Sequence, residues 1–317
     1  MKYTASNTTI KAYRSIARVA SLGSLVLVAN CYAAVSTWTG DGADDNWLTS
    51  GNWAGTVLPA NGDVLIFSGT ANQNNTNNYE TITTAAITFV NNGWVLNGSR
   101  INLAGPIANS AGSNVINLRM ALTDNQTMDV AAGSQLTVNG LVSGGTYGLT
   151  KTGAGTLVLN ADNTFSGVVT INKGTVSVPT LANAGSASPL GAAAGVSHVI
   201  NGGTLEITRE TAGAMIVNPR VTIGTNGGTI CVTNPLVDVR GNIANGWNSG
   251  GNTFIKTGHG TLRFDFPQLL TGTNIVREGP LYLYGSGWFG GNTNIPLFVE
   301  SGGSVAMRAV SATELST

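Results

Sequence analysis

Few side chains in this 317-residue sequence could act as nucleophiles, imidazole bases or thiolate ligands. The chain holds two histidines, His198 and His259, and two cysteines, Cys31 and Cys231. His198 lies in a strand-like apolar run and His259 stands between two glycines, so both are predicted to be structural. Cys231 lies in an alternating run and is predicted to be a small buried hydrophobic residue. Since no HExxH, GxSxG, paired-cysteine or phosphate-binding motif occurs, we predict no catalytic residues, no metal site and no cofactor.

Carboxylates are the other groups that could do chemistry, because glycan-cleaving enzymes use two of them, or an acid beside a base, on one face. In this sequence they are dispersed singly, at Asp124, Asp129, Asp162, Glu206, Glu210, Asp238, Asp265 and Glu278. A repeating fold could still stack Asp129, Asp162 and Glu206, which leaves a polysaccharide lyase or hydrolase open as an alternative. We expect instead that these acids face solvent and maintain solubility.

Three tryptophans, Trp38, Trp47 and Trp53, set residues 38–69 apart from the rest of the chain. A stack of strands must cover its first layer, since a bare end exposes apolar core and unpaired backbone. Large aromatic side chains suit that role, so residues 34–85 are predicted to form an N-terminal cap and the first coils. Two alternatives stay open: the tryptophans could bind sugars with their flat faces, and residues 41–46 could offer oxygen ligands to Ca²⁺.

The composition indicates which elements position these groups. Charged residues make up 9% of the chain, hydrophobic residues 42%, and there are 43 glycines. The absence of a basic cluster argues against nucleic acid as a partner, and the glycine content argues against a helical bundle. Disorder is disfavoured because disordered chains are poor in hydrophobic residues. Many short strands joined by tight turns are the class that remains.

The first residues are predicted to be an export signal. Residues 1–18 carry four bases and no acid, the run Val19–Ala29 is apolar, and Asn30–Ala34 ends in small residues. That order is typical of a secretory signal peptide, and the apolar run is too short for a membrane-spanning helix, which needs about 20 residues. We therefore assign residues 1–33 to a signal peptide, with cleavage after Ala33 or Ala34. An uncleaved amphipathic anchor is the alternative.

Cleavage changes both the cysteine count and the charge. Residues 28–31 are similar to a bacterial lipobox, so lipidation of Cys31 is one outcome, although Asn30 departs from that pattern. Ordinary cleavage removes Cys31 and leaves Cys231 alone, which excludes an intrachain disulfide. It also removes four of the 15 bases and none of the 15 acids, so that 11 bases face 15 acids and the mature chain has a net charge of about −4.

A repeat runs through the mature chain. Residues 149–159 (LTKTGAGTLVL) align without gaps with residues 254–264 (FIKTGHGTLRF), in a register of 105 residues. In the same register Gly167 matches Gly272 and Gly174 matches Gly279. Weaker units of Gly or Gly-Thr followed by alternating apolar residues recur every 19 to 32 residues or so. Glycine there supplies corners that a β-branched residue adopts only at a cost.

This pattern predicts an all-β protein in which strands stack as coils along one axis. The expected fold is a parallel β-helix of roughly twelve coils, with residues 86–317 as the repeat region. A β-sandwich or a β-propeller is the competing architecture.

The run 148–178 (GLTKTGAGTLVLNADNTFSGVVTINKGTVSV) resembles the autotransporter-associated β-strand repeat, with a Lys-Thr-Gly-x-Gly-Thr-Leu opening, an Asn-Thr-aromatic-Ser-Gly middle and a Gly-Thr close. Copy 254–283 is more degenerate, because His259 and Arg263 interrupt it and Leu270-Thr-Gly272 replaces the middle element. The resemblance implies a right-handed parallel β-helix that is extracellular or surface-exposed in a Gram-negative-type bacterium. It also implies the passenger part of a larger protein, and it names no reaction.

The sequence thus predicts an exported, extracellular or outer-membrane-associated scaffold or adhesin-like surface without catalysis. Glycans or cell-surface components are the expected partners, with the secretion machinery during export; a glycan-binding or polysaccharide-degrading β-helix is the alternative function. The residues up to Thr317 contain neither an outer-membrane barrel pattern nor an apolar tail, so we expect a truncated product or another export route.

Overall fold

The computed structural model describes residues 33–217, 219–241, 247–265, 268–284 and 295–308. The chain divides into two units, Met1–Tyr32 and Ala33–Thr317, and every described residue belongs to the second. The expected signal peptide and the lipidation of Cys31 concern residues outside the described ranges, apart from Ala33. Among the described residues no helix is long and apolar enough to cross a membrane.

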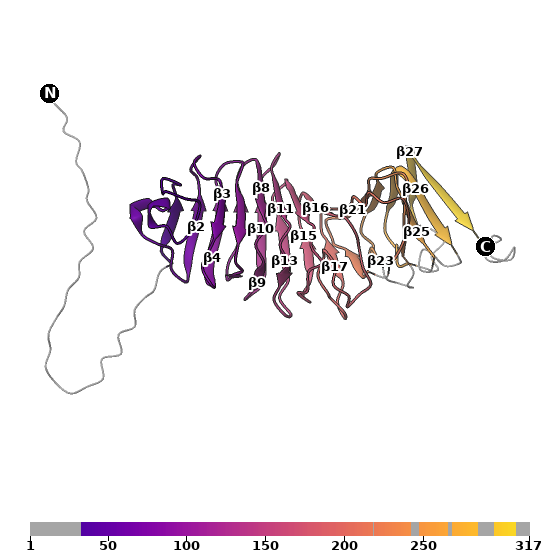
Figure 1. Ribbon diagram of the computed structural model, residues 1–317. Coiled ribbons are helices and arrows are strands. Elements are labelled where there is room, and N and C mark those ends of the chain that lie inside the picture. Colours follow the sequence, from indigo (N-terminus) through magenta and orange to yellow (C-terminus); the bar gives the residue numbers. More distant parts are fainter. Residues whose placement is uncertain (1–32, 218, 242–246, 266–267, 285–294, 309–317) are drawn as a thin grey trace, which may run out of the picture. The chain divides into compact units, whose positions relative to one another are not determined.

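The described chain is a parallel β-solenoid of about 10 turns, as the repeat predicts (Figure 1). Most coils contribute one short strand to each of three faces in turn, while two coils in the middle of the chain contribute to the first two faces only. The first face holds β1 (Val35–Trp38), β2 (Asp63–Phe67), the second half of β4 (Ile82–Phe89), β7 (Ile107–Asn109), β10 (Gln126–Val130), β13 (Leu149–Thr152), β15 (Val169–Ile171), β17 (His198–Ile200), β20 (Val221–Ile223) and β23 (Trp247–Asn248).

The second face is the longest continuous ladder. It runs through β3 (Asn74–Asn77), β5 (Val95–Gly98), β8 (Ser113–Ile116), β11 (Gln135–Val138), β14 (Thr156–Leu159), β16 (Thr175–Val178), β18 (Thr204–Ile207), β21 (Gly228–Val232), β24 (Phe254–Thr257) and the first parts of β26 (Asn274–Tyr284) and β27 (Leu297–Arg308).

The third face consists of two groups of strands. The first group is the start of β4 with β6 (Ile101–Leu103), β9 (Met120–Leu122) and β12 (Val142–Ser143). The second group is β19 (Gly213–Val217), β22 (Val237–Gly241), β25 (Thr261–Phe264) and the later parts of β26 and β27. Two short 3₁₀ helices, η1 (Ser50–Asn52) and η2 (Ala54–Thr56), lie near the start.

The coils stack in register, so most inward positions form columns of apolar side chains. On the second face Leu136, Leu157, Val176 and Leu205 lie above one another and are buried. Most of the residues that alternate with them are polar and, apart from the buried Ser177, they are at least partly exposed, which is the period-two pattern seen in the sequence. The core is therefore a continuous apolar column rather than separate hydrophobic clusters.

The turn count is lower than the twelve coils expected from an average coil length. Coils here are not equally long, because residues 179–197 connect β16 to β17 without contributing a strand to the stack. Regular spacing in the sequence measures only the coils that carry the repeat. An insertion of this kind is invisible to such an average.

The three tryptophans close the first coils. Trp38, Trp47 and Trp53 are at most 1% exposed and pack edge to face, with ring centroids 5.1 and 6.0 Å apart. The Trp47 ring nitrogen donates to Asn75 Oδ1 at 2.7 Å, and the Trp53 ring nitrogen donates to the Trp47 carbonyl at 2.7 Å. These contacts orient each ring inside the core. Their flat faces are therefore not available to a sugar, which removes that alternative.

Candidate functional site

The lysine of the repeat is buried, where it holds a corner of the coil together. Lys151 is 1% exposed, and its Nζ donates to the carbonyl oxygens of Thr152, of Gly153 at 2.8 Å and of Lys173 at 3.2 Å. The first two carbonyls belong to its own corner and the third to the next coil. We call this arrangement the lysine clamp. An ammonium group carries three N–H donors and no acceptor, which matches three converging carbonyls.

The second copy builds the same lysine clamp. Lys256 is fully buried and its Nζ donates to the carbonyls of Thr257 at 2.9 Å, Gly258 at 2.7 Å and Glu278 at 3.0 Å. Burial lowers the pKa of both lysines to about 8. Asp129 partly offsets this by raising the pKa of Lys151, and Cys231 and then Glu278 do the same for Lys256. Both amines therefore remain mainly protonated at neutral pH. The repeated lysine therefore has a structural role in both copies.

A second recurrent contact was missed in the sequence. The Asn163 side chain accepts from the Val142 backbone N–H at 2.7 Å, and the Gln268 side chain accepts from the Trp247 N–H at 2.8 Å. Donors and acceptors are related by the same register of 105 residues. One copy has asparagine and the other glutamine at this position, so a comparison of residue identities does not show that the two side chains make the same contact. The signal was the spacing together with the shared amide chemistry.

A line of hydrogen-bonded asparagines runs along the C-terminal ends of the second-face strands, except that its first member, Asn74, begins β3. Each Nδ2 donates to the Oδ1 of the asparagine in the preceding coil, with distances of 2.7, 2.7, 2.9 and 2.7 Å along the series. The asparagine ladder comprises Asn74, Asn97, Asn117, Asn139 and Asn160. Its side chains are exposed or half-buried. The sequence does not reveal that these asparagines of successive coils contact one another.

A polar cleft of about 460 Å³ opens where this ladder stops. We call it the ladder-end cleft; its lining is Asn160, Pro179, Thr180, Thr208, Arg209, Glu210 and Thr211. Another cleft, of about 510 Å³, lies beside the first face and carries hydroxyl groups but no charged side chain, its lining being Asn125, Thr146, Gly148, Thr150, Ser166, Gly167, Val168, Thr170 and Val196. Both volumes fall in the range of small-molecule sites.

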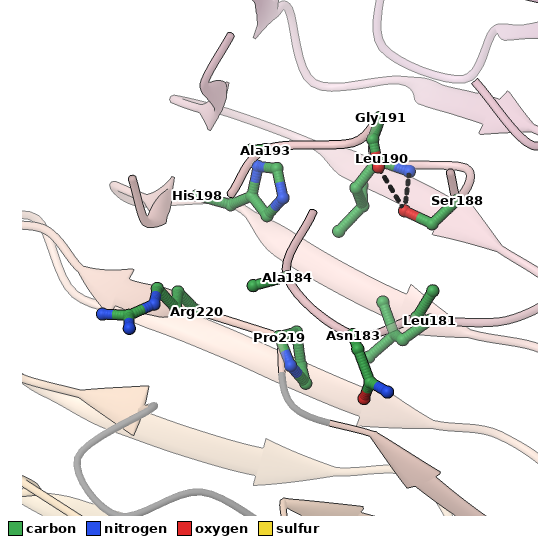
Figure 2. Close-up of a pocket in the computed structure, with 11 residues that line it drawn as sticks. Leu181, Asn183, Ala184, Ser188, Leu190, Gly191, Ala193, His198, Pro219 and Arg220 are labelled. Atoms are coloured by element: carbon green, nitrogen blue, oxygen red, sulfur yellow. Dashed lines mark hydrogen bonds between the residues drawn. The ribbon is translucent and has the colours of Figure 1, made fainter. Parts of the chain in front are cut away.

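His198 borders a far smaller cavity beneath the connection 179–197 (Figure 2). Its Nδ1 accepts from the Val169 backbone N–H at 3.2 Å, and burial lowers its pKa to about 4. Ser188 holds the connection by donating to the Gly191 carbonyl and accepting from the Leu190 N–H. The cavity volume of about 10 Å³ accommodates no more than a water molecule. The imidazole acts here as a neutral packing and hydrogen-bonding group.

The remaining sequence candidates do not converge. Asp129 lies on the first face and accepts from Thr152 Oγ1 at 2.7 Å, whereas Glu206 lies on the second face beside Ser177 and Cys231, so the proposed carboxylate stack does not form. His259 is exposed and lies 3.1 Å from Glu278. In the described ranges no three His, Cys, Asp or Glu side chains form a group that could hold a metal ion.

Cys231 corrects one expectation. It lies on the outside of β21, between the inward-facing Ile230 and Val232, and is half-buried rather than buried. Partial burial, together with Glu206, raises the pKa of its thiol to about 11. A thiol of that kind is protonated at neutral pH and is a poor nucleophile.

The residues proposed as Ca²⁺ ligands form a turn. The carboxylate of Asp44 accepts from the backbone N–H of Asn46 at 3.0 Å and from its side-chain amide at 2.9 Å. Hydrogen bonds from Thr49 and then Asn46 lower the pKa of Asp44. These bonds use the carboxylate oxygens within the turn itself.

Two comparisons bear on this architecture. Residues 149–178, which contain β13 to β16, match the passenger-associated-transport-repeat family. The protein is a passenger-like repeat protein. Over 257 residues, 80% of its chain, it is 27% identical to the adhesin BmaC autotransporter of Brucella suis biovar 1 (strain 1330). The chain spans 7% of that relative's length, and no solved structure matches it significantly.

The family match covers the first lysine clamp, its glycine corners and Asn163, whose partner Val142 lies just before the matched range. The second copy, outside the matched range, builds the same contacts from a divergent sequence. The corner contacts of the matched repeat therefore recur outside the residues that the family model matches.

Proposed function

We propose that this protein is an exported, cell-surface β-solenoid that serves as an adhesive scaffold without catalysis. The observation that carries the proposal is the extent of the similarity to the adhesin autotransporter, which covers 257 residues, 80% of the chain, rather than one repeat. A stack of in-register coils suits this role because it separates a binding surface from the cell by the summed height of its coils.

The dispersed chemistry of the described residues supports the absence of catalysis. Asp129 and Glu206 lie on different faces, and the neutral imidazole of His198 is held by a backbone N–H. A glycan-cleaving enzyme needs two such groups facing one substrate. We therefore favour binding over bond cleavage as the activity of the surface.

Cells that carry the intact gene and cells that lack it test this proposal. Antibody labelling of intact cells is expected to detect the protein outside the cell, and external protease is expected to remove the label. Adherence to epithelial monolayers and to abiotic surfaces is expected to fall severalfold in the deletion strain. A protein that is not labelled on intact cells, or adherence that is equal in both strains on every surface, would contradict the proposal.

A further inference from the structure

The asparagine ladder ends at a defined place with a defined polarity. All four of its hydrogen bonds point the same way, from Nδ2 of one coil to Oδ1 of the coil before it. Aligned amides polarise one another, which strengthens the acceptor at the end of the line. That acceptor is Oδ1 of Asn160.

The next coil does not continue the ladder. Val158 pairs with Ser177, so the residue of the next coil that lies opposite Asn160 is Pro179. Proline has neither a side-chain amide nor a backbone N–H. The following coil brings Thr208 to this corner, where its backbone N–H and its hydroxyl both donate to the Val178 carbonyl. The space left between these residues is the ladder-end cleft.

The cleft combines donors and acceptors without a net charge. Arg209 contributes a guanidinium group, whose contact with the Ala214 carbonyl is a long 3.5 Å, and Glu210 contributes a carboxylate. The Thr180 and Thr208 hydroxyls donate to the Leu181 and Val178 carbonyls, so their oxygen lone pairs remain as acceptors.

We propose that the ladder-end cleft binds a neutral saccharide, which gives the adhesive surface its ligand class. Each sugar hydroxyl both donates and accepts, so neighbouring hydroxyls pair with Asn160 Oδ1 or Glu210 as acceptors and with Arg209 as donor. An anionic ligand meets the Glu210 carboxylate and a cationic ligand meets the Arg209 guanidinium. The volume of about 460 Å³ accommodates one or two sugar rings. The inference rests on the proposed adhesive function.

An array of neutral and acidic mono- and oligosaccharides, probed with the full chain, tests the proposal. Galactose, mannose, N-acetylglucosamine, lactose and maltose are then titrated by calorimetry, with glucuronic acid as the charged comparison. We expect a Kd of about 1 mM for the best neutral monosaccharide. No neutral sugar binding, stronger binding of glucuronic acid, or capture of an unstructured peptide that excess sugar does not displace would overturn it.

Matched variants locate the site. R209Q and E210Q are each expected to weaken binding at least tenfold. R277Q is the control for Arg209, because Arg277 is an exposed arginine at a different place, paired with Glu300. N160L is expected to weaken binding about fivefold, whereas N117L, which interrupts the ladder away from the cleft, loses no more than about twofold. Equal losses in N160L and N117L, or unchanged binding in both R209Q and E210Q, would place the sugar elsewhere.

The adherence assay separates this inference from the proposed function. Adherence by the intact protein with no sugar binding would overturn the inference and leave the adhesive function standing. Sugar binding that R209Q abolishes, with adherence absent from the intact strain, would support the cleft and overturn the adhesive function. Loss of both sugar binding and adherence in R209Q and E210Q would support both the sugar-binding cleft and the adhesive function.

Discussion

The two copies of the repeat have the same internal contacts on different faces of the solenoid. In the first copy the lysine strand β13 lies on the first face and β14 on the second. In the second copy the lysine strand β24 lies on the second face and β25 on the third. The whole unit is thus rotated by one face while the clamp, the amide contact and the glycine corners are retained. A repeat of this kind encodes a corner between two strands, and not a particular face.

Several of the differences between the copies lie on the outside. Thr152 donates its hydroxyl to Asp129 of the preceding coil at 2.7 Å, whereas Thr257 donates to Glu278 of the following coil at 3.3 Å. Ala154 is replaced by the exposed His259. The inward positions differ as well, for example Leu149 against Phe254, but both copies keep the lysine and the amide that bind the backbone. We infer that these backbone-directed side chains determine the corner.

Replacing a clamp lysine should have the largest effect. K151M and K256M each leave three carbonyls at a buried corner without their donor, and we expect each to lower the free energy of unfolding by about 3 kcal/mol. Urea denaturation of the full chain measures the total. Hydrogen exchange with mass spectrometry locates the opened corner.

Lys173 supplies the control for this change. Its backbone carbonyl completes the first clamp while its side chain is exposed. K173M should change stability by no more than about 0.5 kcal/mol. Comparable losses in K173M and K151M would show that positive charge near the corner matters and the clamp does not. A loss in only one of the two clamp variants would break the equivalence of the copies.

Replacing the glycine of each clamp corner with alanine should have the next largest effect. Gly153 and Gly258 have φ angles of +68° and +76°, and a Cβ would lie 2.1 and 2.4 Å from the carbonyl oxygens of Val130 and Val232. G133A separates backbone strain from collision, since Gly133 has φ of +73° and a Cβ there would meet no atom within 4 Å. We expect G133A to cost about 1 kcal/mol, and G153A and G258A about twice that or more.

Thermal and urea unfolding of these three variants give the comparison directly. If G133A destabilises the protein as much as G153A, the left-handed backbone alone accounts for the glycines. If G153A and G258A differ by more than about 1 kcal/mol, the two corners are not equally tight despite their shared contacts.

How far the sequence predicts this architecture depends on the scale of the interaction. Alternation within a strand and glycine at a corner are local, so the strands and the parallel solenoid follow from the pattern. The rotation by one face does not, because it depends on how many strands intervene between the copies, including the connection 179–197. The alignment of Asn117 with Asn139 likewise depends on the register of coils that lie about 20 residues apart. The ladder-end cleft likewise lies where the stacking of equivalent residues is interrupted, and the sequence of a single repeat does not show where that happens.

The pH dependence of stability should reflect both clamps. The pKa of each lysine is about 8 in the folded chain against 10.5 for a free side chain, so between these values the unfolded chain binds more protons. Stability should therefore rise as the pH increases from about 8 towards 10.5. Cys231 opposes this, because its folded pKa of about 11 lies above the ordinary 9.0 and stability is lost as the pH rises between them.

Urea denaturation between pH 8 and 9.5 tests this in the C231A protein, where the opposing thiol is gone. We expect the free energy of unfolding to rise with pH in C231A and to rise less when K151M or K256M is added. A slope that neither lysine variant reduces would contradict the assignment of the proton uptake to the clamps. A reduction by K256M alone would show that only the second lysine is strained by burial.

The smallest effect is expected at the side chains that distinguish the copies. Glu278 accepts from the Gly258 N–H at 2.9 Å and lies 3.1 Å from His259, and the His259 side chain is 70% exposed. E278Q keeps an oxygen acceptor and loses only the charge, so stability should change by about 0.5 kcal/mol or less, with little dependence on salt. H259A should behave alike, because an exposed ion pair contributes little. A loss in E278Q as large as that in K256M would mean that the second corner depends on its own ion pair, and the two copies would then be alike in geometry but not in what stabilises them.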